Sequence, residues 1–174
     1  MSIDKKNTVA NEINNGSNVS ENLSKDNLFF KDNSKEYIKK LKELYLEKNR
    51  LKYPNLPESV RFAPNYTDQN TNGLTKCVID FLKLNGFHCE RTGNEGRVIN
   101  NRRVHGTGTN GTSDIKAIIN GKFIAIEIKC KATKDKQSIA QKEYQKAIEL
   151  SGGIYLIVGT FGGFIDWYEK YLTV

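Results

Sequence analysis

The chain has 174 residues, of which 37% are hydrophobic and 27% charged, with a formal net charge of +7 and an isoelectric point near 9.2. This length suggests one domain plus a tail, and the basic balance favours a polyanionic partner, with nucleic acid first. Three cysteines without C-x-x-C spacing and two histidines argue against a disulfide framework or a structural zinc site, and the lack of a long apolar run argues against a membrane span.

The N-terminal part of the chain divides into a tail, a helix and a connector. Residues 1–33 are dominated by Asn, Ser, Lys and Asp, and we predict disorder because this segment buries too little apolar surface to offset its ordering entropy. From Ser34 to Leu51 the apolar residues keep helical spacing among lysines, which predicts a basic helix. This helix either packs on the domain or a partner, or forms a basic arm along DNA. The segment that follows this helix, up to residue 71, holds all three prolines of the chain, and they predict an extended connector.

Residues 72–174 predict an α/β domain. The expected elements are a helix over 74–85 ending at Gly86, a strand over 87–91, a Gly-rich loop over 92–112, strands over 115–119 and 122–129, a helix over 138–150, a strand over 154–158 and a closing helix over 161–172. This order predicts helices flanking a mixed β-sheet.

A hairpin lies at the centre of this domain. Asn120-Gly121 is the strongest short signal for a type I′ turn. A two-residue turn fixes the register, so that paired residue numbers sum to 241 and Asp114 lies opposite Glu127. Lys129 shares their face, because side chains alternate along a strand. The opposite face is a core face that carries Ile115, Ala117, Ile119, Ile124, Ile126 and Ile128. Two opposed carboxylates repel, so either a hard cation such as Mg²⁺ offsets the charge, or Lys129 screens both acids on a solvated face.

Asp114, followed after the hairpin by Glu127-Ile128-Lys129, resembles the D…ExK core of the PD-(D/E)XK nuclease superfamily. From about Asn72 to the C-terminus the chain is similar to the VRR-NUC branch, to small nuclease-like proteins of phages and mobile elements, and more distantly to archaeal Holliday-junction resolvases. The motifs that carry the resemblance are GLTKCVIDFLKLNGF, ERTGNEGR, GTGTNGTSDI, IEIKCKATKDKQSIAQKEYQ, GGIYLIV and FGGFIDWY.

The resemblance implies a restriction-endonuclease-like core and Mg²⁺- or Mn²⁺-dependent hydrolysis of DNA by an endonuclease, with branched or flapped DNA as candidate substrates. It implies that Asp114 and Glu127 hold the metal, with the backbone carbonyl of Ile128 as a further ligand. Lys129 would orient the attacking water or neutralise charge in the transition state. Gln141 would point at the site from the next helix, although Ser138 and Gln141 also fit a helix capping box.

Two positions depart from the family pattern. Ser113 stands where Pro is frequent, and Thr75 stands where many resolvase-type members carry a Glu on the first helix. The second departure motivates an alternative function, a nucleic-acid-binding module on a nuclease fold that has lost turnover. The tail and the basic helix motivate another, a phage structural or cargo protein.

Basic residues flank the expected site on both sides. A Gly-rich loop can approach a phosphate closely and arginine binds phosphate in a bidentate manner, although the loop could also be mobile and solvated. The expected nucleic-acid contacts are Arg91, Arg97, Arg102, Arg103, Lys131, Lys134 and Lys136. His105 is a weaker candidate for a general base. We expect DNA as the partner, leave a homodimer open, and expect a soluble protein of the cytoplasm, that of the host cell if a phage encodes it, or one packaged in a virion.

Overall fold

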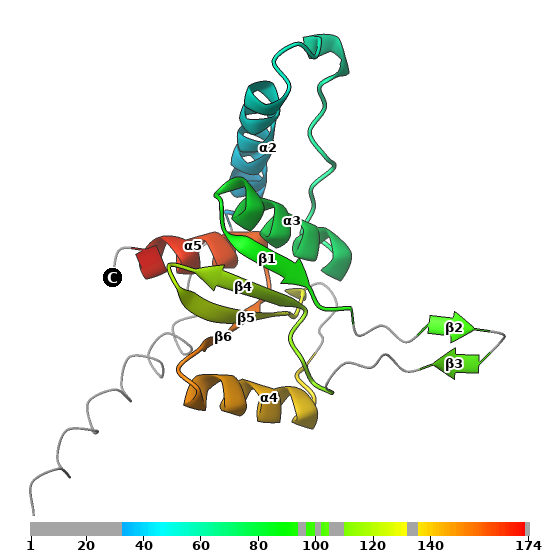
Figure 1. The fold of residues 1–174 in the computed structure, drawn as a ribbon, viewed down its shortest axis with the longest axis vertical. Helices are drawn as coiled ribbons and strands as arrows, with labels where there is room; N and C mark the ends of the chain where they lie inside the picture. The colour runs from blue at the N-terminus through cyan, green and yellow to red at the C-terminus, as the bar shows by residue number, and fades with distance from the viewer. Residues whose placement is uncertain (1–32, 94–96, 100–101, 105–109, 132–135, 173–174) are drawn as a thin grey trace, which may run out of the picture.

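A computed structural model describes residues 33–93, 97–99, 102–104, 110–131 and 136–172. Within these residues the fold is α/β, with a four-stranded mixed sheet flanked by helices, as the sequence predicts (Figure 1). The helices are α2 (Ser34–Lys52), the short 3₁₀ helix η1 (Glu58–Val60), α3 (Thr71–Leu84), α4 (Ile139–Leu150) and α5 (Phe161–Leu172). The strands of the sheet are β1 (His88–Arg91), β4 (Ile115–Ile119), β5 (Lys122–Ile128) and β6 (Ile154–Val158).

The strand order of the sheet is β1-β4-β5-β6. Strands β1, β4 and β5 are antiparallel neighbours, whereas β6 runs parallel to β5. A parallel neighbour needs a crossover connection, and α4 supplies it. Helix α4 lies on one face of the sheet, while α3 and α5 lie on the other (Figure 1).

The β4–β5 hairpin has the predicted turn and register. Asn120 and Gly121 both have positive φ, +50° and +77°, as a type I′ turn requires. Ile119 pairs with Lys122 and Ile115 pairs with Ile126, so the paired numbers sum to 241. This register sets which face of the hairpin each side chain occupies. It therefore produces the predicted separation of a charged face from an apolar face.

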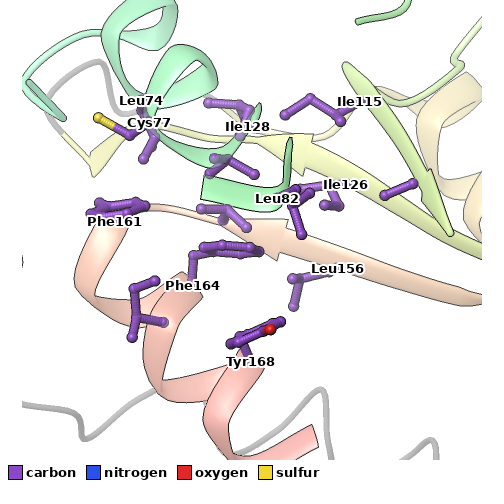
Figure 2. Packing of buried hydrophobic residues seen from close by; sticks show 14 of the residues in the cluster. Leu74, Cys77, Leu82, Ile115, Ile126, Ile128, Leu156, Phe161, Phe164 and Tyr168 are labelled. Carbon is purple, nitrogen blue, oxygen red and sulfur yellow. The ribbon is translucent and has the colours of Figure 1, made fainter. Parts of the chain in front are cut away.

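The core fills the space between the sheet and helices α3 and α5. Figure 2 shows isoleucines of β4 and β5 packed against Leu74 and Leu82 of α3 and against the aromatic rings of α5. Phe161 and Phe164 are almost fully buried and stack with ring centroids 6.2 Å apart. Each such side chain contributes roughly 1.5–3 kcal/mol on burial. Helix α3 ends as predicted, because Gly86 adopts φ +85° and the Phe87 N–H bonds to the Leu82 carbonyl at 3.0 Å.

Helix α2 packs its first half on the domain, which is one of the two predicted alternatives. Leu41 is 2% exposed, and the Tyr37 hydroxyl donates to Asp166 of α5 at 3.0 Å. The far end of α2 projects away from the sheet (Figure 1). The following connector is less extended than predicted, because the buried Arg61 guanidinium donates to the carbonyls of Tyr53 and Leu56 and closes the segment around η1.

The structure also bears on the predicted loop before Asp114 and on the predicted N-terminal tail. The loop expected over 92–112 contains an antiparallel ribbon of β2 (Arg97–Ile99) and β3 (Arg102–Val104), in which each β-branched residue pairs with an arginine. Both short segments contain β-branched residues, which favour strands. The predicted disordered tail lies outside the described residues, apart from Asn33. Over the described ranges, no helix is long and apolar enough to cross a bilayer.

Candidate functional site

Asp114 and Glu127 meet at one end of the β4–β5 hairpin. The register of the hairpin, continued by one residue beyond the Ile115–Ile126 pair, places them opposite each other, as predicted. Asp114 is fixed at two points. Its Oδ2 accepts a hydrogen bond from the Ile128 N–H at 2.8 Å, and its carbonyl accepts one from the Thr92 N–H at 2.8 Å. The Asp114 carboxylate is therefore held against the strand that carries the ExK motif.

Glu127 is buried, with 1% of its surface exposed. Lys129 Nζ lies 3.1 Å from Glu127 Oε1, and Gln141 Nε2 donates a hydrogen bond to the same oxygen. The Tyr155 hydroxyl donates to Oε2 at 3.4 Å. The alternative of a solvated charge cluster is wrong for Glu127, because residues from α4 and β6 cover this carboxylate.

The electrostatics of Glu127 are unfavourable without a further positive charge. Burial raises the pKa of Glu127, the negative charge of Asp114 raises it further, and Lys129 partly opposes both effects. Carboxylates with a perturbed pKa occur preferentially at functional sites. The arrangement therefore suits a ligand that brings positive charge to the two acids.

Lys129 occupies the predicted place on the same face as the two acids. Its side chain is 12% exposed and forms an ion pair with Glu127. This ion pair is the structural role considered for Lys129.

Gln141 makes two sets of contacts with one side chain, one to the helix cap and one to the acid. The Ser138 hydroxyl accepts from the Gln141 N–H at 3.3 Å, and Gln141 Oε1 accepts from the Ser138 N–H at 2.8 Å, which completes the capping box. The opposite end of the same amide, Nε2, donates to Glu127. The first turn of α4 is thereby tied to the carboxylate.

Gly111 brings the segment before Asp114 against the start of α4. Its φ is +79°, and a Cβ at this position would collide with the backbone carbonyl of Ala140. Only glycine permits both the conformation and the approach. The sequence signal for this position is the glycine of GTNGTSD three residues before the acid, whose pattern predicts only a Gly-rich loop.

Tyr155 is a site residue that the sequence analysis missed. It lies in β6, is 6% exposed, and its ring meets that of Tyr144 edge to face with centroids 6.3 Å apart. The available signal was a single tyrosine in the otherwise aliphatic strand IYLIV, because a buried tyrosine hydroxyl usually has a hydrogen-bond partner. Here that partner is Glu127.

The predicted nucleic-acid contacts are only partly described. Arg91 pairs with Ile115, the neighbour of Asp114, and its guanidinium donates to Asn72 at 2.9 Å. Lys131 and Lys136 are exposed and follow Lys129 along the chain. The backbones of Arg97, Arg102 and Arg103 belong to the β2–β3 ribbon, whereas Lys134 and His105 lie outside the described residues.

Thr75 contributes nothing to the acid pair. It is 2% exposed, and its hydroxyl donates to the Thr71 carbonyl within α3 at 2.7 Å. In the part of the chain that the structure describes, no three His, Cys, Asp or Glu residues gather in a metal-ligand arrangement. The protein donors available to a cation are the two carboxylates of Asp114 and Glu127 and nearby backbone oxygens.

Comparison with known proteins returned no similar family model, curated protein or solved structure. Function is therefore inferred from the residues of the site and their geometry.

Proposed function

We propose that this chain is a metal-dependent nuclease that hydrolyses phosphodiester bonds of DNA with Mg²⁺ or Mn²⁺. In this proposal the α/β fold is a restriction-endonuclease-like core of the PD-(D/E)XK superfamily, close to its VRR-NUC branch. The observation that carries the proposal is the buried carboxylate of Glu127, opposite Asp114 and in contact with Lys129 and Gln141.

The donor set suits a hard divalent cation. Mg²⁺ is usually bound through one or two carboxylates, with water and substrate phosphate oxygens completing its shell, and it does not need a cage of protein ligands. The carboxylates of Asp114 and Glu127 would hold the ion, with the Ile128 carbonyl as the proposed third protein ligand. The raised pKa of Glu127 supports this assignment, because a bound cation would offset the two effects that raise it.

The residues of the chain divide the chemistry among them. A bound divalent ion supplies polarisation of the phosphate and a lowered pKa for coordinated water. Lys129 would direct a charged donor at the negative charge that develops on the phosphate oxygens. Gln141 and Asp114 would help to fix the geometry of the site before the reaction begins. Gln141 holds Oε1 of Glu127, and Asp114 is itself held by the Ile128 N–H. A site prepared in this way needs little rearrangement during the reaction.

A binding module without turnover is the second candidate, favoured by one observation. The Thr75 hydroxyl donates to a carbonyl within α3, and this residue offers no acid to the site. Under this alternative, the basic residues around the acid pair would still bind nucleic acid, with a strong dependence on salt.

One assay separates the two candidates. The purified full chain is incubated with linear, flapped and four-way DNA, and with RNA, in Mg²⁺, Mn²⁺ or EDTA, beside Asp114→Asn as the matched control. We expect cleavage of DNA only with a divalent ion and only by the wild type. Binding without cleavage under every condition would favour the module, and equal cleavage by Asp114→Asn would refute the assignment of the site.

A further inference from the structure

Tyr155 lies outside the D…ExK motif, yet its hydroxyl reaches the central carboxylate of the site. The side chain is buried, and its O–H donates to Glu127 Oε2 at 3.4 Å. In the parallel β5–β6 ladder Tyr155 pairs with Ala125, two residues before Glu127. Because side chains two residues apart share a face, the tyrosine reaches the glutamate diagonally across neighbouring strands.

The contacts of Glu127 are divided between its two oxygens. Among the described residues, Oε1 receives Lys129 from the same strand and Gln141 from α4, whereas Oε2 receives Tyr155 from β6. Three elements of structure therefore converge on one carboxylate. A buried carboxylate without partners carries a large desolvation penalty, and each of these donors also restricts its rotation.

Tyr155 is itself held in place. Its ring packs edge to face against Tyr144 of α4. Gln137 forms a side-chain hydrogen bond with the Tyr155 hydroxyl. Gln137 is in turn fixed by Gln145, through a bond of 3.0 Å from Nε2 to Oε1. Tyr144 and Gln137 therefore hold the ring and the hydroxyl of Tyr155 beside Glu127, to which the hydroxyl donates.

We propose that Tyr155 is a positioning residue for Glu127, which holds Oε2 so that a divalent cation meets a carboxylate already oriented for it. This inference rests on the proposed function, since it concerns the same metal site. Partners that orient a metal-binding side chain typically change metal affinity or activity by about 10–100-fold when they are removed. For one hydroxyl at 3.4 Å we expect the lower end, roughly a 10-fold weaker affinity for Mn²⁺.

The test compares Tyr155→Phe with Tyr144→Phe in the full chain. Each variant removes one hydroxyl from one of two rings that touch each other, but the Tyr144 hydroxyl bonds to Ser113 and not to Glu127. Mn²⁺ affinity is measured by isothermal titration calorimetry, and DNA cleavage is measured across a Mn²⁺ titration. We expect Tyr155→Phe to need about 10-fold more Mn²⁺ in both measurements and to approach the wild-type rate at saturation. A loss caused only by poorer packing would instead persist at saturating Mn²⁺.

The other possible results distinguish the positioning role of Tyr155 from the nuclease proposal. Wild-type Mn²⁺ affinity in Tyr155→Phe, or an equal loss in Tyr144→Phe, would overturn the positioning role while leaving the nuclease proposal intact. A wild-type chain that neither binds Mn²⁺ nor cleaves DNA would overturn both proposals. Should Tyr155→Phe fail to fold, Gln137→Ala serves in its place, because it removes a side chain that hydrogen-bonds the Tyr155 hydroxyl, and an unchanged Mn²⁺ affinity in that variant would refute the inference.

Discussion

Neutralising Asp114 should stabilise the metal-free protein and abolish its response to metal. Asp114→Asn removes the charge that faces Glu127 but keeps an oxygen that can accept from the Ile128 N–H. In the wild type this N–H bonds to Asp114 Oδ2 at 2.8 Å. Asp114→Ala removes both the charge and the acceptor. An amide N–H that loses its acceptor in a buried place costs about 1–3 kcal/mol, so the two variants should differ by an amount in this range.

The size of the effect follows from the geometry of the hairpin. Directly opposed residues have Cβ atoms about 4.5–5.5 Å apart, and two unit charges about 6 Å apart interact by roughly 3 kcal/mol at an effective dielectric constant of about 20. Lys129 lies 3.1 Å from Glu127 and offsets part of this repulsion, and Asp114 is only partly buried. We therefore expect Asp114→Asn to raise the free energy of unfolding by about 1 kcal/mol, or roughly 2–4 °C in thermal midpoint.

The pH dependence has a defined sign. Because the folded-state pKa of Glu127 is raised, its stabilising contribution is present below the ordinary glutamate value of about 4.3 and is lost as the pH rises through the raised value. The advantage of Asp114→Asn over the wild type should accordingly grow as the pH rises from about 4.5 towards neutrality, because the repulsion requires an ionised Glu127.

The assay is thermal unfolding of wild type, Asp114→Asn and Asp114→Ala, followed by circular dichroism in EDTA and in excess Mn²⁺. A ligand at about 100 times its dissociation constant stabilises by about 2.7 kcal/mol, so Mn²⁺ should place the wild type above Asp114→Asn and reverse their order. A lower midpoint for Asp114→Asn in EDTA, or an equal gain from Mn²⁺ in both proteins, would refute the reasoning.

The other residues of the site should respond in distinct ways. Lys129→Ala should keep Mn²⁺ binding but slow cleavage by roughly 10²–10³-fold, as loss of a preorganised charged donor does; a loss of Mn²⁺ affinity by calorimetry would contradict this. Gln141→Ala should slow cleavage less and lower the free energy of unfolding by about 1 kcal/mol through the lost capping box, and unchanged urea denaturation would argue against it. Gly111→Ala should impair both folding and cleavage, because the added Cβ collides with the start of α4, and a wild-type melting curve would show that the loop yields without cost. Replacing Arg91 and Lys131 by Ala should flatten the salt dependence of DNA binding, by about one counterion for each lost phosphate contact, as measured by fluorescence anisotropy; an unchanged slope would exclude both from the interface.

The features predicted correctly from the sequence are those with a local cause. The Asn120-Gly121 turn, the glycine end of α3 and the capping box at Ser138 each depend on a few consecutive residues. The pairing of Asp114 with Glu127 also follows from a local cause, because a two-residue turn determines every later pair in the hairpin. The residues of the hairpin alone are therefore enough to predict that the two acids face each other.

The features that were missed depend on contacts between distant segments. Tyr155 reaches Glu127 across 28 residues of sequence, and the identity of its partner follows only from the β5–β6 pairing. Gly111 is required because α4 passes directly beside it, which its own neighbours in the sequence do not reveal. The connector folds around Arg61, whose guanidinium donates to backbone carbonyls. Because every residue has a backbone carbonyl, the sequence does not indicate which ones accept.

The burial of Glu127 belongs between these two groups, since the charged face of the hairpin follows from the sequence, whereas the strand pairing and the placement of the helices come from the structure. All isoleucines of the hairpin except Ile118 occupy one face, so the helices that complete the core lie there. The chain then returns from β5 through a helix to β6, and a parallel return of this kind requires the connecting helix to cross a face of the sheet. With α3 and α5 on that face, α4 lies on the opposite face of the sheet, as Figure 1 shows. By the register of the hairpin, this is the face that carries the charged residues. A carboxylate on a strand flanked by β4 and β6, under the start of that helix, cannot remain solvated. The same crossover that completes the sheet therefore buries the acid, brings Gln141 and Tyr155 to it, and leaves its charge to be offset by Lys129 and, in our proposal, by a metal ion.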